Sequence, residues 1–132
     1  MEVQEQGEQW EDVNGDLEFH YTMIILRKGD DYFHARYNHR MMSPAQINPK
    51  VLKMQQIPTE HLWPVYSKNL TLAPDPLPVD SYIKRPCMIQ YTQDHTCGIP
   101  DLLLAEARIC EILKKHPHPN IARYFGCLVR ND

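Results

Sequence analysis

The strongest constraint on the fold is a change of hydrophobic period along the chain. Large apolar residues occupy every second position from Leu17 to Ile25, which is the period of a β-strand. From Asp101 to Lys115 apolar residues instead recur every three or four positions, which is the period of an α-helix. The two periods together predict an α+β fold with a small antiparallel sheet and one main helix.

The N-terminal part of the chain divides into two predicted segments. Residues 1–26 contain seven acidic residues and no Lys or Arg, so residues 1–16 are predicted to be an acidic, disordered tail that can be removed. Residues 17–37 are predicted to be a β-hairpin with one buried face. Its turn would lie at Arg27 to Asp31, where Gly29 can adopt positive φ, and the aromatic stretch after it would be the returning strand.

Residues 38–80 are predicted to be a Pro-rich extended arm or insertion. Seven of the 11 prolines lie in this segment, and proline removes a backbone donor that sheets and helices need. Ser43 and Pro44 suit the cap and first position of a helix, which Pro49 would end within one or two turns.

Residues 81–132 are predicted to be compact. A short strand is expected at 81–85, and Pro86 would end it or cause a bulge. The main helix follows and ends at His116-Pro117-His118-Pro119, after which Ile121 to Val129 would be a final strand.

Glu106 is the residue that does not fit an ordinary surface helix. On a helical wheel it shares a face with Leu102, Ile109 and Leu113, so it is predicted to point toward the core or to lie at the edge of the apolar stripe. A carboxylate facing the core is unstable without a cation. Glu111 instead neighbours basic residues and is predicted to be solvated.

Several function classes lose support from composition alone. The acidic start lacks the features of a secretory signal, and no apolar run approaches the length of a membrane span. The four cysteines are predicted to be reduced thiols of a cytoplasmic chain, with the nucleus left open. Neither His95-x-Cys97 nor His116-x-His118 has the second half of a zinc site. The dilute positive surplus after residue 26 does not predict nucleic-acid binding.

The order of elements in 81–132 resembles the small, N-terminal lobe of protein kinases. His118-Pro119-Asn120-Ile121 matches the turn that follows the regulatory helix of that family, and Tyr82-Ile83-Lys84 stands where the family has its lysine strand. The Pro-rich arm before a Lys-Arg-Pro strand is similar to fungal kinase-like families. The resemblance implies that Lys84 binds the phosphates of ATP and that Glu106 fixes the lysine.

The chain also departs from the family. Only Gly29 is present where a glycine-rich loop should cover the phosphates, and Asp30 and Asp31 add negative charge there. The 132 residues contain no His-Arg-Asp catalytic loop and no Asp-Phe-Gly metal motif. The chain is therefore predicted to bind ATP weakly or not at all, to hold no metal site, and to lack phosphotransfer activity by itself.

Three interpretations stay open. The chain is either a kinase-domain fragment or a non-enzymatic interaction module that keeps a degenerate kinase lobe as a docking surface for a protein partner. The third interpretation is an unrelated small α+β domain with a coincidental turn motif.

Overall fold

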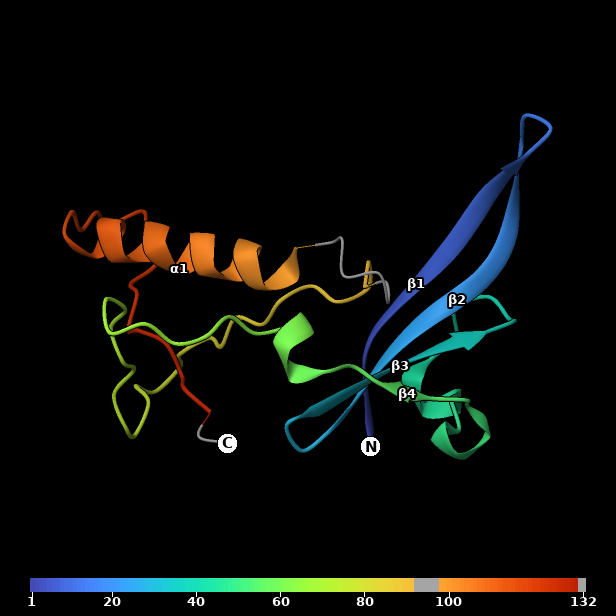
Figure 1. Cartoon of the computed structure of the whole chain (residues 1–132), viewed down its shortest axis with the longest axis horizontal. Coiled ribbons are helices and arrows are strands. Elements are labelled where there is room, and N and C mark those ends of the chain that lie inside the picture. The colour runs from blue at the N-terminus through green and yellow to red at the C-terminus, as the bar shows by residue number, and fades with distance from the viewer. Residues whose placement is uncertain (92–97, 131–132) are drawn as a thin grey trace.

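The chain forms a four-stranded antiparallel sheet and one long helix in a computed structural model that describes residues 1–91 and 98–130 (Figure 1). The sheet has the strand order β1-β2-β3-β4. Its strands and the helix have these bounds: β1 Glu2–Val13, β2 Asp16–Lys28, β3 Asp31–Tyr37, β4 Gln55–Gln56 and α1 Ile99–Lys114. The α+β class predicted from the two hydrophobic periods is confirmed.

The prediction of a disordered acidic tail at 1–16 is wrong. Glu2–Val13 form β1, which pairs with β2 from Glu2 opposite Arg27 to Val13 opposite Asp16. The turn between them lies at Asn14 and Gly15, which both have positive φ. Figure 1 shows the far end of this β1–β2 hairpin projecting away from the rest of the molecule.

The predicted hairpin at 17–37 is present as β2 and β3, with Lys28 opposite Asp31 at the turn. The prediction that only one face of β2 is buried is wrong. Five consecutive residues of β2 are buried, from Thr22 to Leu26, whereas Leu17 is exposed. A strand that is apolar without alternation is typical of a sheet covered on both faces.

Each face of the sheet has its own hydrophobic cluster. Met23 and Ile25 pack with Ile57, Leu62, Met88 and Ile99 on one face. Ile24 and Leu26 pack with Ala35 and Ile47 on the other. The Pro-rich segment supplies residues to both clusters, so its apolar side chains cover the sheet.

Three short 3₁₀ helices interrupt the Pro-rich segment, at Pro44–Gln46, Pro49–Val51 and Thr59–His61. The first has the predicted capping pattern, with Ser43 and Gln46 forming a reciprocal capping box.

The main helix is confirmed at Ile99–Lys114, with proline in its first turn and Lys114 in its last. Ile99 is buried in one core cluster and joins the start of α1 to the sheet. The predictions of strands at 81–85 and 121–129 are wrong. Residues 81–85 form no strand, and 121–129 form only an isolated bridge, in which Cys127 pairs with Leu72. Part of the polar loop expected before the helix, residues 92–97, lies outside the described residues.

Candidate functional site

The structure brings together the two residues singled out by the kinase resemblance. Lys84 Nζ lies 2.8 Å from Glu106 Oε2, which is the distance of a direct, charge-assisted hydrogen bond. Glu106 projects from the middle of α1, whereas Lys84 lies on an irregular segment. The hydrogen bond to Glu106 is the main cause that raises the pKa of Lys84, and burial acts in the opposite direction.

The surroundings of this pair differ from the predicted core. The side chains of Lys84 and Glu106 are 62% and 49% exposed. Of the apolar neighbours on the same helix face, Leu102 and Ile109 are also exposed, whereas Leu113 is half-buried. Of the two positions predicted for Glu106, the one that faces an apolar core is wrong, and an ion pair this exposed stabilises the fold by less than about 1 kcal/mol.

The segment that carries Lys84 is attached to the sheet through β1. The carboxylate of Glu5 accepts hydrogen bonds from the backbone amides of Met88 and Ile89, at 3.0 and 2.9 Å. The Ile89 side chain lies against Gly7, where an added Cβ would be 2.6 Å from Ile89 Cγ1. The Glu5 carboxylate therefore attaches this segment to β1 through side-chain-to-backbone hydrogen bonds rather than through strand pairing.

Glu111 has a structural role that the sequence did not predict. Its carboxylate accepts hydrogen bonds from Thr71 N at 2.6 Å, Thr71 Oγ1 at 2.9 Å and the Tyr124 hydroxyl at 2.9 Å. Hydrogen bonds to the ionised form hold the pKa of Glu111 below its usual value, the backbone amide of Thr71 having the largest effect. Burial, Cys127 and Glu111 together raise the pKa of Tyr124.

The Glu111 carboxylate lies where three segments of the chain meet. Beside it, Cys127 N donates to Thr71 O at 2.7 Å and Ala73 N donates to Cys127 O at 2.9 Å. The bonded residues lie far apart in the sequence, so no local pattern indicated the contact. Glu111 therefore joins α1 to the Pro-rich segment and to the segment that follows the helix.

Replacing Glu111 by glutamine is expected to lower the free energy of unfolding by about 1 kcal/mol at neutral pH, after allowance for its solvent contact. Because the folded-state pKa is lowered, the contribution of Glu111 is complete above its ordinary pKa of 4.5 and is lost as the pH falls through the folded value. Urea unfolding at about pH 7 and about pH 3 measures the difference. Glu60→Gln is the control, since no hydrogen bond of its carboxylate occurs among the described residues. A difference that persists at the lower pH would contradict this account.

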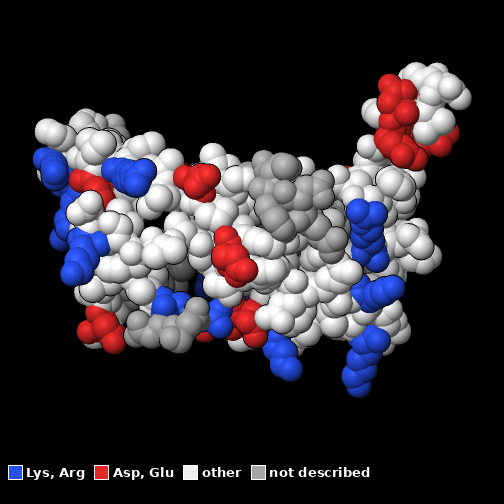
Figure 2. Space-filling view, viewed as in Figure 1, with Lys and Arg blue, Asp and Glu red and all other residues white. Residues whose placement is uncertain are grey.

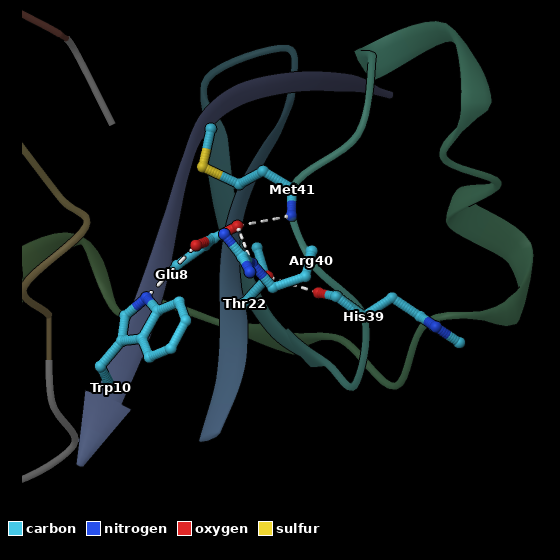
Figure 3. Close-up of polar contacts among 6 residues, drawn as sticks. All are labelled: Glu8, Trp10, Thr22, His39, Arg40 and Met41. Carbon is cyan, nitrogen blue, oxygen red and sulfur yellow. Dashed lines mark hydrogen bonds and ion pairs between the residues drawn. The ribbon is translucent and has the colours of Figure 1, made fainter. Parts of the chain in front are cut away.

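A second polar cluster ties the segment after β3 to β1. Glu8 Oε1 accepts from Arg40 Nε at 2.7 Å and from Met41 N at 3.1 Å, and Trp10 Nε1 donates to the other oxygen at 3.2 Å (Figure 3). The hydrogen bond from Arg40 is the largest of the effects that lower the pKa of Glu8. In the same view Thr22, which is fully buried, donates to the carbonyl of His39 at 2.5 Å. Glu5 and Glu8, two of the acidic residues of β1, therefore bind partners in the fold.

The described residues include no group of three His, Cys, Asp or Glu side chains placed to hold a metal ion. Cys87, Cys110 and Cys127 are free thiols, and Cys97 lies outside the described residues. Within 1–91 and 98–130, no helix has the length and apolar character needed to cross a bilayer.

Comparison with protein-family models, with curated proteins and with solved structures finds no match to this chain.

Proposed function

We propose that this chain is a nucleotide-contacting element of a protein-kinase-like small lobe. Lys84 would contact phosphate oxygens of ATP, and Glu106 would hold the lysine in position. The observation that carries the proposal is the 2.8 Å contact between Lys84 Nζ and Glu106 Oε2. It joins a lysine before the helix to a glutamate within it, and the turn His118-Pro119-Asn120-Ile121 follows that helix.

The same arrangement limits what the chain does to the nucleotide. Phosphoryl transfer in kinases needs an aspartate near the acceptor hydroxyl and side chains that hold Mg²⁺, in addition to the lysine. The 132 residues lack the motifs that supply those groups. The proposed role is therefore binding of a nucleoside triphosphate by this chain, without transfer of its phosphate.

The charges around the β2–β3 turn also affect the expected affinity for ATP. Asp30 and Asp31 occupy the position of the phosphate-covering loop in the resemblance, and each carboxylate lies 3.7 Å from an arginine nitrogen, of Arg27 and Arg130 respectively. Those arginines partly offset the negative charge that would repel a triphosphate. With Lys84 largely exposed, we expect a Kd of about 1 mM, which corresponds to roughly −4 kcal/mol.

Titration of the full chain with ATP, followed by amide NMR spectra, tests this function. We expect shift changes near Lys84 and Glu106, and Lys84→Met is expected to weaken binding about tenfold, because one charge-assisted hydrogen bond is lost. Lys53→Met removes another exposed charge elsewhere and is expected to leave binding unchanged. Equal binding by the two variants, or no shift changes in the wild-type chain, would contradict the proposal.

A further inference from the structure

A groove of about 770 Å³ lies beside the C-terminal end of α1. One wall is formed by the last turn of the helix, and the other by residues 117–125. Its lining includes the apolar residues Leu113, Ile121 and Phe125. The volume is in the range of sites that enclose a ligand or a side-chain anchor.

The groove lining carries two cationic side chains, and the carboxylate of Glu111 lies next to it, accepting a hydrogen bond from the lining Tyr124 hydroxyl at 2.9 Å. Lys114, His118 and Arg123 contribute to its lining, which contains no aspartate or glutamate. The guanidinium of Arg123 lies 5.3 Å from the centre of the Phe125 ring, and within 1–91 and 98–130 no ion pair of Arg123 occurs. Lys114 reaches Thr71 Oγ1 at 3.2 Å and is exposed. The groove therefore fits an apolar side chain flanked by carboxylates.

The projecting tip of the β1–β2 hairpin has that chemistry. Residues 11–18 contain four acidic residues and no Lys or Arg. Leu17, between Asp16 and Glu18 in the sequence, has 73% of its surface exposed. An apolar residue this exposed, among charges on a projecting hairpin, is suited to insertion into a partner.

The tip and the groove lie at opposite ends of the molecule, so one copy cannot bring them together. Figure 2 shows acidic side chains on the projecting tip and several basic side chains over the distant end, where Figure 1 shows that α1 finishes. We propose that the acidic hairpin tip, residues 11–18, docks into the groove of a second copy of this chain.

The contact is head-to-tail, because it uses two different surfaces of the chain. Such contacts extend into open chains unless the rotation between copies closes a ring. The interface is small and is charged at its rim, so self-association is weak, near roughly 0.1 mM, and is reduced by salt. The groove lining does not include Lys84 or Glu106.

Sedimentation velocity of the full chain, from about 0.01 to 1 mM and at low and high salt, tests the proposal. The sedimentation coefficient is expected to rise with concentration at low salt, and this rise should disappear at high salt. Asp16→Lys/Glu18→Lys alters the tip, and Lys114→Glu/Arg123→Glu alters the groove; each should be monomeric throughout. Lys50→Glu/Lys53→Glu makes the same charge change as the groove variant at exposed positions elsewhere and should associate like the wild type.

Mixing the two monomeric variants gives the decisive result, because the mixture still contains one intact tip surface and one intact groove surface. The mixture is expected to associate, since the intact tip of the groove variant can dock into the intact groove of the tip variant. Circular dichroism confirms that each variant is folded, and Arg123→Glu alone replaces the double groove variant if that variant unfolds. A wild-type chain that stays monomeric at low salt, association of either variant alone, or a mixture that stays monomeric would overturn the proposal.

Discussion

Gly126→Ala is expected to lower the free energy of unfolding by about 3 kcal/mol, or to detach residues 126–127 locally from residues 71–73. Gly126 has a φ of 122°, which is unfavourable for any residue with a side chain. A Cβ there would also lie 2.7 Å from backbone atoms of Thr71, Leu72 and Ala73. The clash falls on the backbone that exchanges hydrogen bonds with Cys127, so it cannot be relieved by rotating a side chain.

Urea unfolding and hydrogen exchange of the Cys127 amide measure this effect. Gly29→Ala is the matched control, because Gly29 also has positive φ but has no atom within 4 Å of an added Cβ. Gly29→Ala is expected to lower the free energy of unfolding by about 1 kcal/mol, which is the penalty for a left-handed conformation alone. Equal losses for the two variants, with the Cys127 amide still protected, would contradict the close approach of 71–73 and 126–127.

Ile24→Ala and Ile25→Ala are each expected to destabilise the chain by about 2–5 kcal/mol. Both side chains are fully buried, and they lie in different hydrophobic clusters on opposite faces of the sheet. Truncation of either leaves a cavity that its neighbours cannot fill. Val51→Ala, at a 72% exposed position, is the control and is expected to change stability by less than about 0.5 kcal/mol.

Urea or thermal unfolding of the three variants distinguishes a doubly covered sheet from a sheet with one buried face. A sheet with one buried face would give a large loss for Ile25→Ala and a small loss for Ile24→Ala. A near-neutral Ile24→Ala variant would show that the Pro-rich segment does not cover the second face.

The elements that the sequence predicted correctly are those set by local patterns. The helix at Ile99–Lys114 has proline in its first turn, a basic last turn and a His-Pro-His-Pro stop. The β2–β3 hairpin has a turn with Gly29 at positive φ between two strand-forming stretches. These signals act within a few residues, so one sequence is sufficient to identify them.

The elements that the sequence missed depend on contacts between distant residues. The acidic composition of β1 indicated disorder, but Glu8 pairs with Arg40 and Glu5 binds the amides of Met88 and Ile89. Conversely, a strand was predicted at 81–85, but none of the four described strands of the sheet pairs with this segment. A strand requires a neighbour with free backbone groups, and sequence alternation does not specify one.

The candidate site was predicted in part. The resemblance indicated that Lys84 and Glu106 should lie close together, and their 2.8 Å separation is consistent with that geometry. The exposure of Leu102 and Ile109 was not predicted, because the residues that would cover them cannot be identified from the helix pattern alone. The hydrogen bonds of Glu111 lacked any local signal, since its partners Thr71 and Tyr124 lie in other segments.

Labelling with an acyl-phosphate derivative of ATP, followed by mass spectrometry, tests the proposed function most directly. The reagent acylates lysines that lie beside the bound phosphates, so it identifies the contact residue. Lys84 is expected to be acylated in preference to the exposed Lys50 and Lys53, excess ATP should protect it, and Glu106→Gln should reduce its labelling. Equal labelling of all three lysines, unaffected by ATP, would contradict the proposal that Lys84 and Glu106 form a nucleotide site.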